Sequence, residues 1–157
     1  MDIEGSFVLQ GSPERVYGYL VDPGFIGDHL ADVENVEVID NDNFNVRAKV
    51  GIGFMKGKVD FKFHFDEKVA PKSGKLVGNG TGLGSKVDVT ILFTLADGGE
   101  STTIGWKSHA SLSGKIASIA GGALQSVVKK NTQRFIESIK QGIDAELSAA
   151  GAAAGRS

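Results

Sequence analysis

A regular alternation of apolar and polar residues runs through the middle of the chain and predicts long antiparallel strands. In the clearest segment, 55–66, Met, Gly, Val and Phe occupy the odd positions, while Lys, Asp and His occupy the even ones. Six such pairs predict a strand with one face in the core and one in solvent. Similar but shorter or interrupted patterns predict further strands at 3–10, 33–39, 44–50, 75–83, 86–95 and 102–112.

Helix signals lie near the start and at the end of the chain. Ser12-Pro13-Glu14 combines an N-cap residue, a proline at the first helical position and an acid in the first turn. Asp22-Pro23 repeats the signal and predicts a second short helix to about Leu30. A long amphipathic helix is predicted over 114–147, and its apolar stripe is Ile116, Ala120, Leu124, Val128, Asn131, Phe135, Ile139 and Ile143.

This order of elements predicts an α+β fold in which a curved antiparallel sheet of about seven strands wraps around one long C-terminal helix. Strands with one apolar face need a cover, and the long helix is the candidate cover. A sheet curved around a single helix leaves room between them, so the pattern predicts a binding cavity. We expect residues 1–147 to form one domain and residues 148–157, which are Ala, Gly, Ser and one Arg, to form a flexible tail.

Composition narrows the range of functions. The chain has 41% hydrophobic and 23% charged residues, as in an ordinary globular domain, and no cysteine, which excludes disulfides and a cysteine nucleophile. A net charge of −2 argues against general nucleic-acid binding. We find neither a signal peptide nor an integral membrane segment. We therefore expect a cytoplasmic protein, with peripheral attachment to the inner membrane face through a partner left open.

Alternating glycines between 78 and 84 allow two interpretations. They do not form a phosphate-binding loop, because a strand follows them instead of a helix N-terminus. With Leu76 they occupy one face of a predicted strand. If that face points inward, the missing side chains either let neighbouring groups pack closely or leave volume for a ligand.

Inward-facing residues define a candidate site for a hydrophobic small molecule. Asn131 interrupts the apolar stripe of the long helix, and a buried amide must find a partner. Its partner is either backbone or water, or a polar group of a ligand, and Ser108 could join it. We predict a site formed by Phe61, Phe63, Gly80, Val89, Ile91, Trp106, Ser108, Leu124, Val128, Asn131 and Phe135.

Other candidate chemistry is weak. Asp28, His29 and Asp32 could approach one another on a helix, but a divalent metal usually needs more ligands at fixed geometry, so we predict no metal site. We also predict no cofactor and no catalytic residue. His64 and His109 fall on polar strand faces. Lysines at 56, 58 and 62 line one outer face, as a solvated surface or as a docking patch for an acidic partner.

Short motifs, in their order along residues 2–147, resemble the carbon monoxide dehydrogenase G-subunit family, which is part of the START-like (helix-grip, SRPBCC) superfamily. Each motif alone is weak, but their order is fairly specific. The motifs are Gly5-Ser6-Phe7, Ser12-Pro13-Glu14-Arg15-Val16, Leu20-Val21-Asp22-Pro23, Val36-Glu37-Val38-Ile39, Val50-Gly51-Ile52-Gly53, Lys56-Gly57, Gly78-Asn79-Gly80-Thr81-Gly82 and Ser113-Gly114-Lys115-Ile116-Ala117.

The resemblance implies a non-catalytic accessory protein of a molybdenum hydroxylase, acting in maturation or recruitment of the enzyme or carrying a quinone or other lipid. The chain departs from the family pattern twice. It has Ala31-Asp32 where the family usually has Pro-Gly, and an Ala/Gly-rich end where many members have a hydrophobic anchor. A polyketide cyclase/aromatase-like enzyme and a stress-linked client-binding domain are alternatives on the same fold. The cyclase would need a titratable group facing inward.

Overall fold

A computed structural model describes residues 1–52, 55–118 and 121–154 of the chain. Its single sheet has seven antiparallel strands in the order β1-β7-β6-β5-β4-β3-β2, which confirms the predicted fold class. The strands are β1 (Asp2–Gln10), β2 (Val33–Val38), β3 (Asn43–Ile52), β4 (Met55–Val69), β5 (Ser73–Gly82), β6 (Ser85–Asp97) and β7 (Ser101–Gly114). The helices are α1 (Pro13–Leu20), α2 (Pro23–His29), the 3-10 turn η1 (Lys115–Ser118) and α3 (Gly121–Ala154).

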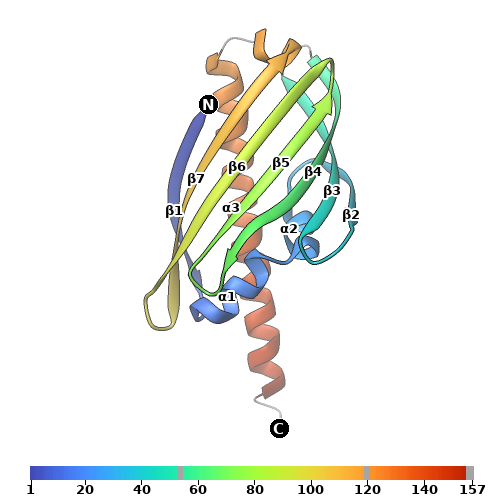
Figure 1. Ribbon diagram of the computed structural model, residues 1–157. Helices are drawn as coiled ribbons and strands as arrows, with labels where there is room; N and C mark the ends of the chain where they lie inside the picture. Colours follow the sequence, from blue (N-terminus) through green and yellow to red (C-terminus); the bar gives the residue numbers. More distant parts are fainter. Residues whose placement is uncertain (53–54, 119–120, 155–157) are drawn as a thin grey trace.

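The sheet curves around α3, and the two short helices close one end of the space between them (Figure 1). Both short helices begin where their capping residues predict. The Ser12 side chain accepts a hydrogen bond from the Arg15 amide, and the Asp22 side chain accepts from Gly24 and Phe25. Deeply buried Ile139 and Ile143 anchor the second half of α3 in the core beside these helices.

Strand β4 keeps the predicted alternation. Val59 and Phe65 are buried and Phe61 and Phe63 are half-buried on the inner face, while Lys62 is exposed on the outer face. A shift of one residue would have buried the charges, so the alternation fixes the register. A bulge interrupts the pairing of β4 with β5 only after Phe65.

The long helix differs from its prediction at both ends. Residues 115–118 form a separate 3-10 turn, and α3 begins at Gly121 instead of about Gly114. The backbone of Gly114 has a positive φ of 82°, which ends β7 and is incompatible with a helix start. At the other end α3 continues past Leu147 to Ala154, because alanine has the highest helix propensity.

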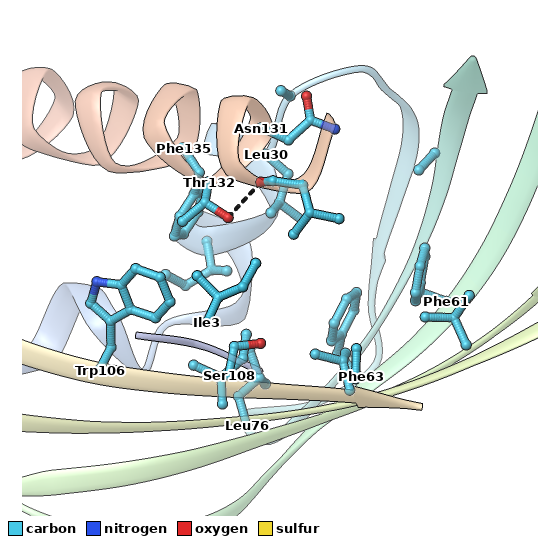
Figure 2. A pocket seen from close by; sticks show the side chains of 18 of the residues that line it. Ile3, Leu30, Phe61, Phe63, Leu76, Trp106, Ser108, Asn131, Thr132 and Phe135 are labelled. Atoms are coloured by element: carbon cyan, nitrogen blue, oxygen red, sulfur yellow. Dashed lines mark hydrogen bonds between the residues drawn. The ribbon is translucent and has the colours of Figure 1, made fainter. Parts of the chain in front are cut away.

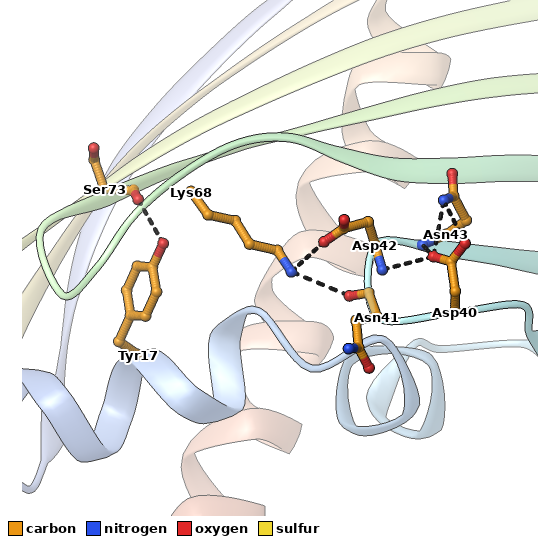
Figure 3. A network of polar contacts seen from close by, with 7 residues as sticks. All are labelled: Tyr17, Asp40, Asn41, Asp42, Asn43, Lys68 and Ser73. Atoms are coloured by element: carbon orange, nitrogen blue, oxygen red, sulfur yellow. Dashed lines mark hydrogen bonds and ion pairs between the residues drawn. The ribbon is translucent and has the colours of Figure 1, made fainter.

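Polar contacts hold the end of the sheet that lies next to α1 and α2 (Figure 3). The Tyr17 hydroxyl donates to the Ser73 carbonyl at 2.9 Å, and burial raises the pKa of this phenol. Lys68 pairs with Asp42 and donates to the Asn41 carbonyl at 3.1 Å. These contacts connect α1 and the β2–β3 turn to the residues on either side of the β4–β5 turn, so side chains from three segments stabilise this end of the sheet.

Deleting residues 148–157 should leave the melting temperature nearly unchanged. The last turns of α3 extend beyond the sheet in Figure 1, and Ala, Gly, Ser and one Arg offer little apolar surface to bury. Thermal unfolding of the full chain and of a chain ending at Leu147 tests this. A loss of about 1 kcal/mol in the free energy of unfolding lowers the melting temperature of a domain of this size by about 2–4 °C. A fall of more than about 5 °C would therefore show that the segment packs against the domain.

Candidate functional site

An apolar cavity of about 440 Å³ lies between the inner face of the sheet and the first half of α3. Its volume falls within the range of roughly 300–1,000 Å³ that is typical of small-molecule sites. The sheet supplies one wall, α3 covers it, and residues from both ends of the chain meet across it (Figure 2). Of the 34 described residues that line it, thirty are apolar.

One wall of the cavity is a series of aromatic rings from β3 and β4. Phe61 stacks on Phe63 with ring centroids 5.3 Å apart, and Phe63 stacks on Phe44 at 5.1 Å. The rings on β4 lie over glycines of β5. A β-carbon at Gly80 would stand 2.6 Å from the Phe61 ring, and one at Gly78 would overlap the Phe63 ring in the same way. The missing side chains therefore give the two rings the room that they occupy next to β5.

Among the described lining residues four are polar, and they fall into two pairs. Ser108 and Thr132 are half-buried, whereas Lys49 and Asn131 are exposed to solvent. Ser108 faces the interior from β7, while Thr132 faces it from α3 (Figure 2). The Thr132 hydroxyl donates to the Val128 carbonyl at 2.8 Å, so its proton is already used. Among the described residues the Ser108 hydroxyl has no hydrogen-bond partner. Ser108 is therefore the interior group that can both donate to and accept from a ligand.

Ten of the eleven residues predicted for the site line this cavity. The exception is Gly80, which faces inward as expected but is covered by the Phe61 ring. At this position the close-packing interpretation of the glycines applies, and no ligand volume lies directly over Gly80.

The interpretation of Asn131 as a buried amide was wrong. Asn131 lines the cavity but is exposed to solvent, because α3 presents it at the edge of the cavity next to Leu30 (Figure 2). Water can satisfy its amide, so it does not require a ligand. The polar position that faces inward on α3 is its neighbour Thr132, which the sequence analysis did not single out.

Trp106 contributes surface to the cavity but no hydrogen bond. Its indole lies against Gly5 of β1, the residue paired with it in the sheet. The indole Nε1 is fully buried and has no hydrogen-bond partner among the described residues. An atom with no surface open to the cavity cannot donate to a molecule inside it, which leaves Ser108 as the donor on the sheet wall.

Lys49 near the end of β3 and Asn131 of α3 are the described lining residues exposed to solvent, which indicates that the cavity reaches the surface between these two elements. Leu30, Ala31, Val50 and Val127 are half-buried lining residues next to them in the chain or one helical turn away. Strand β2 begins only at Val33, so the last residues of β3 have no strand beside them there. Periodicity alone does not single out these residues, and the signal that points to them is the pair of short tandem helices before β2.

An ion pair bridges the two sides of this opening. Arg134 of α3 donates to the carboxylate of Asp32 at 3.2 Å, and the Asp32 carbonyl accepts from the Lys49 amide at 2.8 Å. Asp32 has a positive φ of 57°. Glycine adopts this backbone conformation more readily than aspartate does.

The interior of the cavity is almost entirely apolar. Among the described lining residues the one ionisable side chain is that of Lys49, an exposed residue. Among the described residues, no group of three or more His, Cys, Asp or Glu side chains is placed to hold a metal. The residues that the structure covers also include no helix with the length and hydrophobicity needed to cross a bilayer.

Known structures share this fold. A conserved protein from Geobacillus kaustophilus matches with a TM-score of 0.83 and 27% identity, over 92% of this chain and 96% of that one. A START superfamily protein from Mycobacterium smegmatis matches at 0.67 and 7%, over 92% and 97%. The Zhui aromatase/cyclase from a Streptomyces species matches at 0.67 and 14%, over 96% and 98%.

A comparison with curated proteins finds no significant match. The model of one protein family, CoxG, which is the G-subunit of carbon monoxide dehydrogenase, matches residues 5–144. That range covers β1 through most of α3 and includes nearly all of the cavity lining. The chain therefore belongs to the CoxG family of carbon monoxide dehydrogenase and has its START-like fold.

Proposed function

We propose that this protein is a non-catalytic accessory protein that holds a hydrophobic, ring-bearing small molecule, such as a quinone, in the cavity between the sheet and α3. The observation that carries this proposal is the chemistry of the cavity: about 440 Å³, almost entirely apolar, with one free hydroxyl inside. Sites of this kind bind by burial of apolar surface and use a few polar groups to orient the ligand.

The aromatic wall supports a planar ligand. The near-parallel rings of Phe44, Phe61 and Phe63 form a stacked series, and its half-buried members Phe61 and Phe63 can contact another ring. Ser108 lies across from the α3 wall, where it can donate to a carbonyl of that ring. A quinone combines a planar ring with carbonyl acceptors, so it fits both features.

Family membership supports an association with a molybdenum hydroxylase of the carbon monoxide dehydrogenase type. In this proposal the protein supplies or retains a hydrophobic molecule for the enzyme, or takes part in its maturation or recruitment. Native mass spectrometry of the protein from its own host tests the carrier role. A co-purified small hydrophobic molecule supports it, and a uniformly ligand-free protein contradicts it.

A cyclase-like enzyme is the less supported alternative. The Zhui aromatase/cyclase has the same fold at 14% identity, which is a similarity of fold alone. An aromatase/cyclase reaction moves protons and would need a titratable group beside the substrate. The lining residues inside the cavity are apolar apart from two hydroxyls, and the lysine stands at the edge, so this inventory favours binding.

Replacing Ser108 with Ala should weaken quinone binding by a few-fold to about tenfold, whereas Asn131→Ala should change it little. The first variant removes the interior donor, and one such hydrogen bond contributes about 0.5–1.5 kcal/mol. The second removes an amide that water already solvates. Titration of a short-chain quinone followed by Trp106 fluorescence measures both. If neither wild type nor the variants give a saturable response, the quinone proposal is wrong. If the Asn131 variant is the weaker binder, the assignment of Ser108 is wrong.

A further inference from the structure

The long helix α3 is held to the rest of the molecule by apolar packing and by one polar contact. Arg134 donates to the carboxylate of Asp32 at 3.2 Å, and the two side chains are 51% and 49% exposed. Among the described residues, no other hydrogen bond or ion pair joins α3 to another element. We call this contact the Asp32–Arg134 bridge.

The bridge spans the place where the cavity reaches the surface. Arg134 lies one helical turn from Asn131, the exposed lining residue of α3. Asp32 directly follows Ala31, which also lines the cavity. The Asp32 carbonyl accepts a hydrogen bond from the Lys49 amide at 2.8 Å, and Lys49 is the exposed lining residue of β3. Asp32 therefore connects α3 to β3 across the opening.

The backbone of Asp32 is held in an unusual conformation. Its φ of 57° lies in the left-handed region, which costs free energy for a residue with a β-carbon. Such residues persist where the surrounding structure fixes them, and they concentrate at ligand clamps and switch segments. Two contacts fix Asp32, namely the bridge on its side chain and the Lys49 amide on its carbonyl. Since glycine would adopt this φ more readily, the contribution of aspartate here is the carboxylate of the bridge.

We infer that the Asp32–Arg134 bridge controls how fast a small molecule enters and leaves the cavity. The inference rests on the proposed function, because it concerns exchange of the ligand that the cavity holds. An ion pair with both partners half exposed is weak, so it breaks and re-forms readily. Salt screens such a pair but does not weaken apolar packing. Ionic strength therefore regulates access to the cavity.

Stopped-flow mixing of the full chain with a short-chain quinone, followed by Trp106 fluorescence, tests the inference. Arg134→Met breaks the bridge and retains an apolar side chain of similar length. It should raise the association and dissociation rate constants together, by about two- to fivefold, and leave the dissociation constant nearly unchanged. Loss of a direct ligand contact would instead raise the dissociation constant. Added salt should speed exchange in wild type but not in the variant.

Two further variants separate the bridge from net charge and from stability. Arg47→Met breaks another exposed arginine–aspartate pair, formed with Asp60 at 2.8 Å on the outer face of the sheet, and should exchange ligand like wild type. Asp32→Gly removes the carboxylate and relieves the backbone, so it should exchange as fast as Arg134→Met with a nearly unchanged melting temperature. Equal acceleration by Arg47→Met, or wild-type rates in Asp32→Gly, would overturn the inference.

Acrylamide quenching of the ligand-free protein keeps this inference apart from the proposed function. Trp106 is the one tryptophan of the chain and lines the cavity, so a small neutral quencher reports access to it without any ligand. Arg134→Met should raise the quenching constant, while Arg47→Met should not. Raised quenching without quinone binding would remove the proposed function and leave the bridge in control of access. Unchanged quenching in Arg134→Met would overturn the inference, whether or not the quinone binds.

Discussion

Replacing Ala110 with Phe should lower ligand affinity at least a hundredfold while the protein stays folded. Ala110 lines the cavity from β7, so a phenyl group at this position extends into space that a ligand would occupy. Displacing about four buried methylene equivalents of ligand costs roughly 3 kcal/mol, which corresponds to that loss. The added side chain fills existing volume, so the melting temperature should stay the same or rise.

Ser111→Phe is the matched control for this experiment. Ser111 is the next residue on the same strand, but it is exposed on the outer face. The control adds a ring without changing the cavity, so it should bind a short-chain quinone like wild type. Trp106 fluorescence reports binding, and a thermal melt verifies folding. A folded Ala110→Phe protein with wild-type affinity would place the ligand outside the cavity.

Gly114→Ala should be the most destabilising single substitution discussed for this chain, with a loss of about 2–5 kcal/mol. Two costs combine at this position. The backbone has a φ of 82°, which disfavours any residue with a β-carbon. A β-carbon would also overlap the carbonyl group of Gly84, and a backbone neighbour cannot rotate away. The melting temperature should fall by roughly 5–15 °C.

Gly99→Ala isolates the first of these costs. Gly99 has a similar φ of 90°, but no atom lies within 4 Å of the added carbon. It should lose only about 1 kcal/mol. Denaturant unfolding of both variants gives the comparison, and equal losses would mean that the contact with Gly84 contributes nothing. Gly114 also positions Ile116, whose amide donates to Ser85 Oγ at 2.9 Å, so this junction closes one end of the cavity.

The sequence alone predicts the faces of the strands well, because alternation has only two possible outcomes. Once Phe63 is inside, Lys62 must be outside, and this reasoning extends to most of the cavity lining. Alternation could not decide whether the missing side chain of Gly80 leaves volume for a ligand or lets a neighbouring group pack closely. The answer depends on the position of the Phe61 ring, which comes from the neighbouring strand. Pairing between strands is a tertiary property that periodicity within one strand does not contain.

The helical stripe was less informative for a different reason. The face that a helix packs against a sheet is broad, and the spacing of apolar residues by three and four does not define the two edges of that face. Asn131 falls at the edge of the face, so it is exposed, whereas Thr132 falls within it. The opening depends on where β2 begins relative to β3. No local pattern in either segment encodes that relation.

The uneven burial of α3 gives its two halves different local stabilities. Ile139 and Ile143 are 1% and 0% exposed, whereas Val127 and Val128, over the cavity, are half-buried, and Leu124 is the buried residue among those described in the first half. The second half of the helix is therefore packed more firmly than the first. Separating the first half from the sheet exposes less apolar surface than unfolding the whole domain, so we expect it to cost less free energy. Such local opening would let a ring-sized molecule enter and leave while the domain remains folded.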